Sequence, residues 1–150
     1  MNVKDKQGTS PILWCVMNGH TQLLSKIIFI GGGDYNQKNN DGESLLHIAT
    51  RNGFKTIAFA LIEADGIDLN VTTTSYNCTA LHLACYYNQI DIATKLIEFG
   101  ADMTIKDTYD GKTAIAYVQE EEMRKMLIEK NPRKDTQSIE EIDVDVFRAS

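Results

Sequence analysis

Two cysteines and a histidine lie within eight residues of this 150-residue chain, in the stretch CTALHLAC at 78–85. Thiolate and imidazole groups bind Zn²⁺, and a cysteine beside a histidine can also form a nucleophile with its base. On a helix, His82 and Cys85 share a face, because residues three apart lie one above the other. The stretch therefore has two chemical interpretations, and a third in which Cys78, His82 and Cys85 have separate structural roles.

A six-residue pattern recurs four times along the chain, and the stretch at 78–85 contains its third copy. The copies read SPILWC, SLLHIA, TALHLA and TAIAYV, and they begin at Ser10, Ser44, Thr79 and Thr113. The intervals between these hydroxyl residues are 34, 35 and 34 residues, and a near-constant period of this length indicates a repeat architecture. The elements that position the cysteines and the histidine are therefore units of a repeat.

Glycine and asparagine keep the same phase as the hydroxyl residues. Two residues before each hydroxyl residue stand Gly8, Gly42, Asn77 and Gly111. Nine residues after each of the first three hydroxyl residues stand Gly19, Gly53 and Asn88. These residue types tolerate the positive φ that turns and helix ends require. Apolar residues with helical spacing fill the intervals, for example Ile57, Ala58, Leu61 and Ile62. Each unit is predicted to be a short helix, a tight turn, a second helix and a polar loop.

Two other stretches have simple structural interpretations. The glycine run at 31–33 lacks the lysine and the hydroxyl residue of a phosphate-binding loop, so we predict a helix-ending turn there. The acidic run at 120–122 is predicted to end a short helix, with its carboxylates in solvent. The fourth unit is shorter than the others, as expected of a unit that ends a stack.

The repeated pattern resembles the ankyrin repeat, and the third unit, with TALHLA at 79–84 and GAD at 100–102, matches it most fully. The resemblance covers roughly residues 2–131. It implies an all-α solenoid of about four helix-turn-helix units with short connecting loops, occupying residues 1–132. Leu13 and Ala116 depart from the pattern, because they replace its histidine in the first and fourth units. The segment 2–8 reads as a loop that follows a preceding repeat, so we expect a piece of a longer protein with Trp14 partly exposed.

The resemblance also indicates which interpretation of Cys78, His82 and Cys85 is favoured. His47 and His82 occupy the same repeat position, where the imidazole of an ankyrin repeat bonds a nearby hydroxyl and the backbone of the neighbouring loop. Cys85 falls at a variable position, and Cys78 falls in a loop. The resemblance therefore favours three separate structural roles, with no catalytic residue, no metal and no cofactor, over a zinc site or a nucleophile.

Ankyrin stacks usually bind partner proteins through a concave face made of the loops and the first helices. Carried over position by position, the predicted binding residues are Tyr76, Tyr86, Tyr87, Tyr109, Arg51, Met17, Asp41, Glu43 and Asp110. Tyrosine and arginine are common in binding hot spots, and the acidic side chains favour a partner with a basic segment. The predicted function is protein recognition. The alternative is a regulatory or substrate-recruiting domain of a larger enzyme.

Composition narrows the classes of partner and compartment. The net charge of −6 does not favour nucleic acid, and no apolar run approaches the length of a membrane span. The N-terminus lacks the apolar region of a signal peptide, and three cysteines are an odd number, so we expect free thiols in the cytoplasm or the nucleus. We expect a monomer. Residues 133–150 form an acidic segment that is either a linker or a docking peptide.

Overall fold

A computed structural model describes residues 10–31 and 33–132 of the chain. The predicted first loop at 2–8 and the predicted tail at 133–150 lie outside the described residues. Seven α-helices and one 3₁₀-helix occur in the described part of the chain: α1 (Pro11–Met17), α2 (Thr21–Ile30), α3 (Leu45–Arg51), α4 (Lys55–Ile62), α5 (Ala80–Tyr86), α6 (Ile90–Glu98), η1 (Ala114–Tyr117) and α7 (Glu121–Glu129). No strand forms within these ranges, and the predicted all-α class is confirmed.

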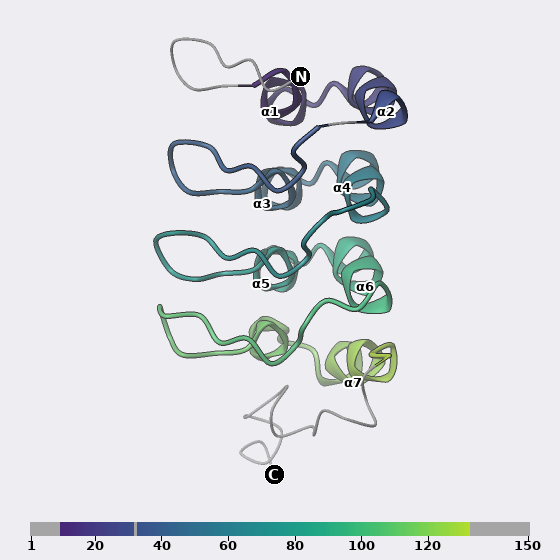
Figure 1. Cartoon of the computed structure of the whole chain (residues 1–150). Coiled ribbons are helices and arrows are strands. Elements are labelled where there is room, and N and C mark those ends of the chain that lie inside the picture. The colour runs from purple at the N-terminus through teal and green to yellow at the C-terminus, as the bar shows by residue number, and fades with distance from the viewer. Residues whose placement is uncertain (1–9, 32, 133–150) are drawn as a thin grey trace.

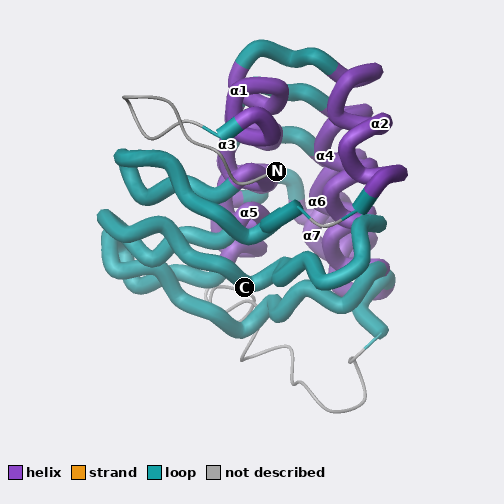
Figure 2. The backbone as a smooth tube through the Cα atoms, turned by 45° about the horizontal axis from the view of Figure 1, so that its top comes forward, coloured by secondary structure: helices purple, strands orange, loops and turns teal. Residues whose placement is uncertain are grey.

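The helices form two layers of a single stack. Figure 1 shows α1, α3, α5 and η1 one above the other in the first layer, with α2, α4, α6 and α7 in the second. The long loops between units project beside the first layer, on the side away from the second. Figure 2 shows these loops running together along one side of the stack. The predicted order of short helix, turn, second helix and loop is therefore present in the described units.

The first helix of each complete unit begins at its hydroxyl residue. Ser10, Ser44 and Thr79 are extended N-caps, and each side-chain oxygen accepts a hydrogen bond from a backbone N–H three residues later. The predicted turn residues that fall within the described range have positive φ, including the non-glycine residues Asn77 at 52° and Asn88 at 57°. Gly31, with φ of 83°, ends α2 as predicted for the glycine run.

The fourth unit differs from the other three. Its first helix is only the 3₁₀-helix η1, and the side chain of Thr113 does not cap it. Ala116 stands where His47 and His82 complete a capping box, so this helix start lacks the stabilisation that the second and third units have. The predicted position of the acidic run is wrong, because Glu121 begins α7 instead of ending a helix. Carboxylates there stabilise the positive end of the helix dipole.

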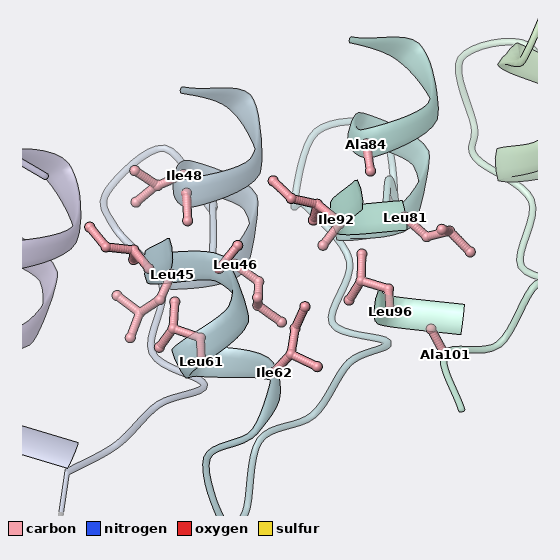
Figure 3. Packing of buried hydrophobic residues seen from close by; sticks show 14 of the residues in the cluster. Leu45, Leu46, Ile48, Leu61, Ile62, Leu81, Ala84, Ile92, Leu96 and Ala101 are labelled. Carbon is pink, nitrogen blue, oxygen red and sulfur yellow. The ribbon is translucent and has the colours of Figure 1, made fainter. Parts of the chain in front are cut away.

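The core runs through the stack between the two layers. Apolar side chains from both layers of each unit meet there, among them Leu46, Ile62, Leu81 and Leu96 (Figure 3). These four side chains are almost fully buried, so most of the stability comes from packing within units and between neighbouring units. Among the described residues, no helix has both the length and the apolar character needed to cross a membrane.

Candidate functional site

His47 and His82 each join two neighbouring units through hydrogen bonds. Nδ1 of His82 lies 2.8 Å from the hydroxyl of Thr79 and accepts from the Thr79 backbone N–H at 3.2 Å. Its Nε2 lies 3.0 Å from the carbonyl oxygen of Lys112 in the next loop. His47 repeats this arrangement with Ser44 and with the carbonyl oxygen of Cys78. Each imidazole therefore has both ring nitrogens occupied by structural bonds.

The hydrogen bonds also define the protonation state of these imidazoles. Because a backbone N–H points at Nδ1, that nitrogen must accept, and the Nε2–H then donates to the carbonyl. A proton on Nδ1 would place two donors against each other. Burial lowers the pKa of both His47 and His82 below the ordinary value, although the carbonyl bond opposes the shift. Both rings are therefore neutral in the folded protein at neutral pH.

These shifts predict that the fold loses stability in mild acid. In the unfolded chain, His47 and His82 become protonated as the pH drops below about 6.5. In the folded chain their pKa values are lower, so they stay neutral to a lower pH. The free energy of unfolding therefore decreases as the pH is lowered from about 6.5 towards the folded-state pKa values. The urea concentration at the midpoint of unfolding should therefore decrease when the pH is lowered from 7.5 to 5. A double variant, His47→Asn with His82→Asn, should show a lower midpoint with a weaker dependence on pH. An equally steep dependence in that variant would contradict the assignment.

The environments of Cys78 and Cys85 distinguish between the chemical and the structural interpretations of the stretch at 78–85. Cys85 is buried, and burial raises the pKa of its thiol to about 12. Burial and the charge of Asp107 also raise the pKa of Cys78, so both are protonated thiols and weak nucleophiles. Among the described residues, no three His, Cys, Asp or Glu side chains are grouped as metal ligands. The geometry supports separate structural roles for the three residues.

Five tyrosines line one groove beside the third and fourth units. They are Tyr76, Tyr86, Tyr87, Tyr109 and Tyr117, and the space that they enclose measures about 330 Å³. We call this space the tyrosine groove. Tyr76 and Tyr109 meet at 5.4 Å between ring centroids, Tyr86 meets Tyr87 at 5.1 Å, and Tyr86 meets Tyr117 at 5.9 Å, all nearly perpendicular. The four tyrosines predicted from the sequence are thus brought together, and a fifth joins them.

The end of α5, the end of η1 and two loops position these rings, with Tyr117 as the last residue of η1. Tyr86 is the last residue of α5 and Tyr87 is its C-cap, so the two follow the same helix end. Tyr76 and Tyr109 belong to successive loops, which are joined by a hydrogen bond of 2.8 Å from the Thr108 N–H to the Tyr76 carbonyl. Tyr76, Tyr86, Tyr87 and Tyr109 each remain about half exposed or more. Large aromatic side chains that are held together and left in water are typical of a binding surface.

Two aspartates supply negative charge to the tyrosine groove. Asp107 is buried, and its carboxylate accepts from the Tyr117 hydroxyl and from the backbone N–H groups of Asp110 and Lys112. Burial alone would raise the pKa of Asp107, but these hydrogen bonds outweigh it and hold the pKa below its ordinary value. Asp110 also lines the groove and is exposed. The groove is therefore both aromatic and negatively charged.

The other predicted binding residues lie outside the tyrosine groove. Arg51 pairs with Glu43 through two bonds, Nε–Oε2 at 2.9 Å and Nη2–Oε1 at 3.0 Å. Arg51 therefore offsets the negative charge of Glu43. Asp41 and Met17 are exposed, but neither lines the groove.

Of the other residues that line the tyrosine groove, Tyr117, Asp107 and Leu83 had no role in the prediction from sequence, whereas His82 and Cys78 were given structural roles. Tyr117 follows Thr113 by four residues, as Leu83 follows Thr79, so the register could have placed both on the same face of the stack. Asp107 precedes Thr113 by six residues in a polar loop, and the sequence carries no signal that its carboxylate is buried. Trp14, in the position of Leu83, is 47% exposed and stacks on His20, as expected for a partly exposed residue.

Comparisons with known proteins address the family of this chain. Residues 12–107 match the family model described as Ankyrin repeats (3 copies). Alpha-latroinsectotoxin-Lt1a of Latrodectus tredecimguttatus is 34% identical over 122 residues, which are 77% of this chain and 8% of that protein.

Two further relatives are similar over smaller parts of the chain. The Inhibitor of Bruton tyrosine kinase of Xenopus laevis is 34% identical over 84 residues, covering 56% of this chain and 6% of the relative. The Putative ankyrin repeat protein L371 of Acanthamoeba polyphaga mimivirus is 31% identical over 109 residues, covering 70% and 13%. The chain thus spans only a small part of the length of these relatives.

Proposed function

This chain belongs to the ankyrin repeat family, and we propose that it recognises a partner protein through the tyrosine groove. Ankyrin repeats are a protein–protein interaction module. The observation that carries the proposal is the gathering of Tyr76, Tyr86, Tyr87 and Tyr109, from two loops and one helix end, around one groove. None of these side chains belongs to the hydrophobic core, and each is about half exposed or more. The partner is a protein or peptide with a basic segment.

The negative charge of the groove supports the choice of a basic partner. Asp107 is ionised at neutral pH, Asp110 is exposed beside it, and the chain carries a net charge of −6. Complementary charge mainly accelerates encounter, whereas the aromatic rings supply contact area. The same proposal describes a monomer in the cytoplasm or the nucleus, where its three free cysteines stay reduced.

A regulatory role within a larger protein is the second candidate. Its motivation is that the chain spans 8%, 6% and 13% of the three relatives, one of which is named as an inhibitor of a kinase. In such a protein the stack would restrain an attached enzymatic domain or recruit a substrate to it. The tyrosine groove would be the contact surface in this case as well, so variants of the groove tyrosines test the binding contact that both candidates require.

We expect that Tyr87→Ala and Tyr76→Ala each weaken partner binding by at least about 1 kcal/mol, or about fivefold, because truncation removes one of the rings that line the groove. A pull-down with the 150-residue chain supplies the partner, and titration calorimetry measures the affinity. Circular dichroism checks that each variant is folded.

The matched control is Phe29→Ala. Phe29 is an exposed aromatic residue near the end of α2, far from the groove along the stack, so its loss should leave the affinity unchanged. If both tyrosine variants bind as the unmodified chain does, the groove is not the contact surface and the proposal fails.

A further inference from the structure

The charge of the tyrosine groove favours a positively charged ligand. Its lining includes Asp107 and Asp110 but no lysine or arginine. The other titratable groups there, the imidazole of His82 and the thiol of Cys78, are neutral at pH 7, because their pKa values are lowered and raised respectively by burial. The side chains that carry charge in the lining of the groove are therefore both acidic.

One aromatic ring of this cluster already contacts a cation. The Nζ of Lys112 lies 5.5 Å from the centroid of the Tyr117 ring, within the range of a cation–π interaction. The face of an aromatic ring carries negative charge density, so five rings around one space multiply the sites at which a cation is attracted. A ligand cation entering the groove would find the same kind of contact that Lys112 makes at its edge.

The hydrogen-bond acceptors of the groove distinguish between possible cations. The Asp107 carboxylate is 3% exposed and already accepts from Tyr117, Asp110 and Lys112, so it contributes charge but little room for another donor. An ammonium is strongly hydrated and loses its water at a high cost when few acceptors replace it. A guanidinium is less hydrated and planar, and it stacks on aromatic faces.

Asp110 offers a second carboxylate to a ligand in the groove. Its carboxylate is exposed at the lining of the groove, and no described residue forms an ion pair with it. A guanidinium that stacks on a tyrosine ring can present two parallel N–H groups to such a carboxylate. The apolar side chain of Leu83, which also lines the groove, suits the methylene stem that an arginine buries.

We propose that the tyrosine groove is a receptor for one arginine side chain of the partner, stacked on the tyrosine rings and paired with Asp110. This rests on the proposed function, which assigns the groove to partner binding. It adds which side chain anchors the partner.

The test uses small probes with the 150-residue chain. Four N-acetylated amides carry the side chains of arginine, citrulline, lysine and trimethyllysine, and NMR titration follows the tyrosine ring signals. Citrulline has nearly the shape of arginine but no charge. The arginine probe should bind at least about fivefold more tightly than the citrulline probe, the size of a cation–π contact plus a charged pair. It should exceed the lysine probe by about the same factor, because the ammonium is more strongly hydrated and cannot stack as a planar group. It should also bind more tightly than the trimethyllysine probe.

Two variants with the same change in net charge locate the contact. Asp110→Asn should weaken binding of the arginine probe at least about threefold, because it removes the paired carboxylate and keeps its shape. Asp41→Asn, an exposed aspartate outside the groove, should leave binding unchanged.

The proposal is overturned if citrulline, lysine or trimethyllysine binds as tightly as arginine, if no probe shifts the tyrosine signals, or if Asp110→Asn has no more effect than Asp41→Asn. These outcomes differ from a failure of the proposed function. That function fails only if Tyr76→Ala and Tyr87→Ala leave partner affinity unchanged, so the groove could still bind a partner without an arginine anchor.

Discussion

Replacing His82 by alanine should lower the free energy of unfolding by about 1–3 kcal/mol, the cost of leaving buried hydrogen-bonding groups unpaired. The imidazole lies between the N-cap residue of α5 and the next loop, and it is almost fully buried. Its removal deprives the Thr79 N–H, the Thr79 hydroxyl and the Lys112 carbonyl of a partner. Urea unfolding followed by circular dichroism measures the change.

The control for this prediction is His20→Ala. His20 is exposed and stacks on Trp14 at 4.7 Å between ring centroids, but no unit is joined through it. Its loss should change the free energy of unfolding by no more than about 0.5 kcal/mol, as is usual at the surface. A similarly small change for His82→Ala would show that the imidazole does not hold the junction between the third and fourth units.

The prediction of the fold from sequence succeeds where a signal repeats. The interval of 34 or 35 residues sets the same helix start at Ser10, Ser44 and Thr79, and each is an N-cap in the structure. The role of His47 and His82 was predicted from their shared repeat position together with the resemblance to the ankyrin repeat. Repetition works because each unit meets the same local requirements, which are a cap, a positive φ at the turn and an apolar face.

The prediction is less complete where a contact depends on one unit alone. The ion pair between Arg51 and Glu43 joins a helix end to a loop residue eight positions earlier. It does not recur at the equivalent positions of the other described units, so the repeat pattern could not reveal it. The bond between Tyr117 and Asp107 arises in the fourth unit, where η1 replaces a regular first helix. Only the second contact lies at the tyrosine groove, where both Tyr117 and Asp107 belong to the lining, whereas Arg51 and Glu43 lie outside it.

The comparison of Ile92 with Leu23 shows how stability depends on neighbouring units. Both residues stand thirteen positions after the hydroxyl that begins their unit, at Thr79 and Ser10. Ile92, on α6 in the middle of the stack, is 1% exposed, whereas Leu23, on α2 in the first described unit, is 46% exposed. Figure 3 shows Ile92 within the apolar core beside α5. The same repeat position is therefore buried only where another unit packs against it.

Ile92→Ala should lower the free energy of unfolding by about 2–5 kcal/mol, because it removes buried carbon atoms and leaves a cavity that neighbouring units fill only in part. Leu23→Ala should cost at most about 1 kcal/mol, since nearly half of the side chain is already in water. Urea unfolding of both variants gives the midpoints and the slopes. An unchanged slope for Ile92→Ala would mean that the stack still unfolds as one body. Equal losses for the two variants would contradict the structure, because they would require the exposed face of the first unit to be covered as fully as the junctions within the stack.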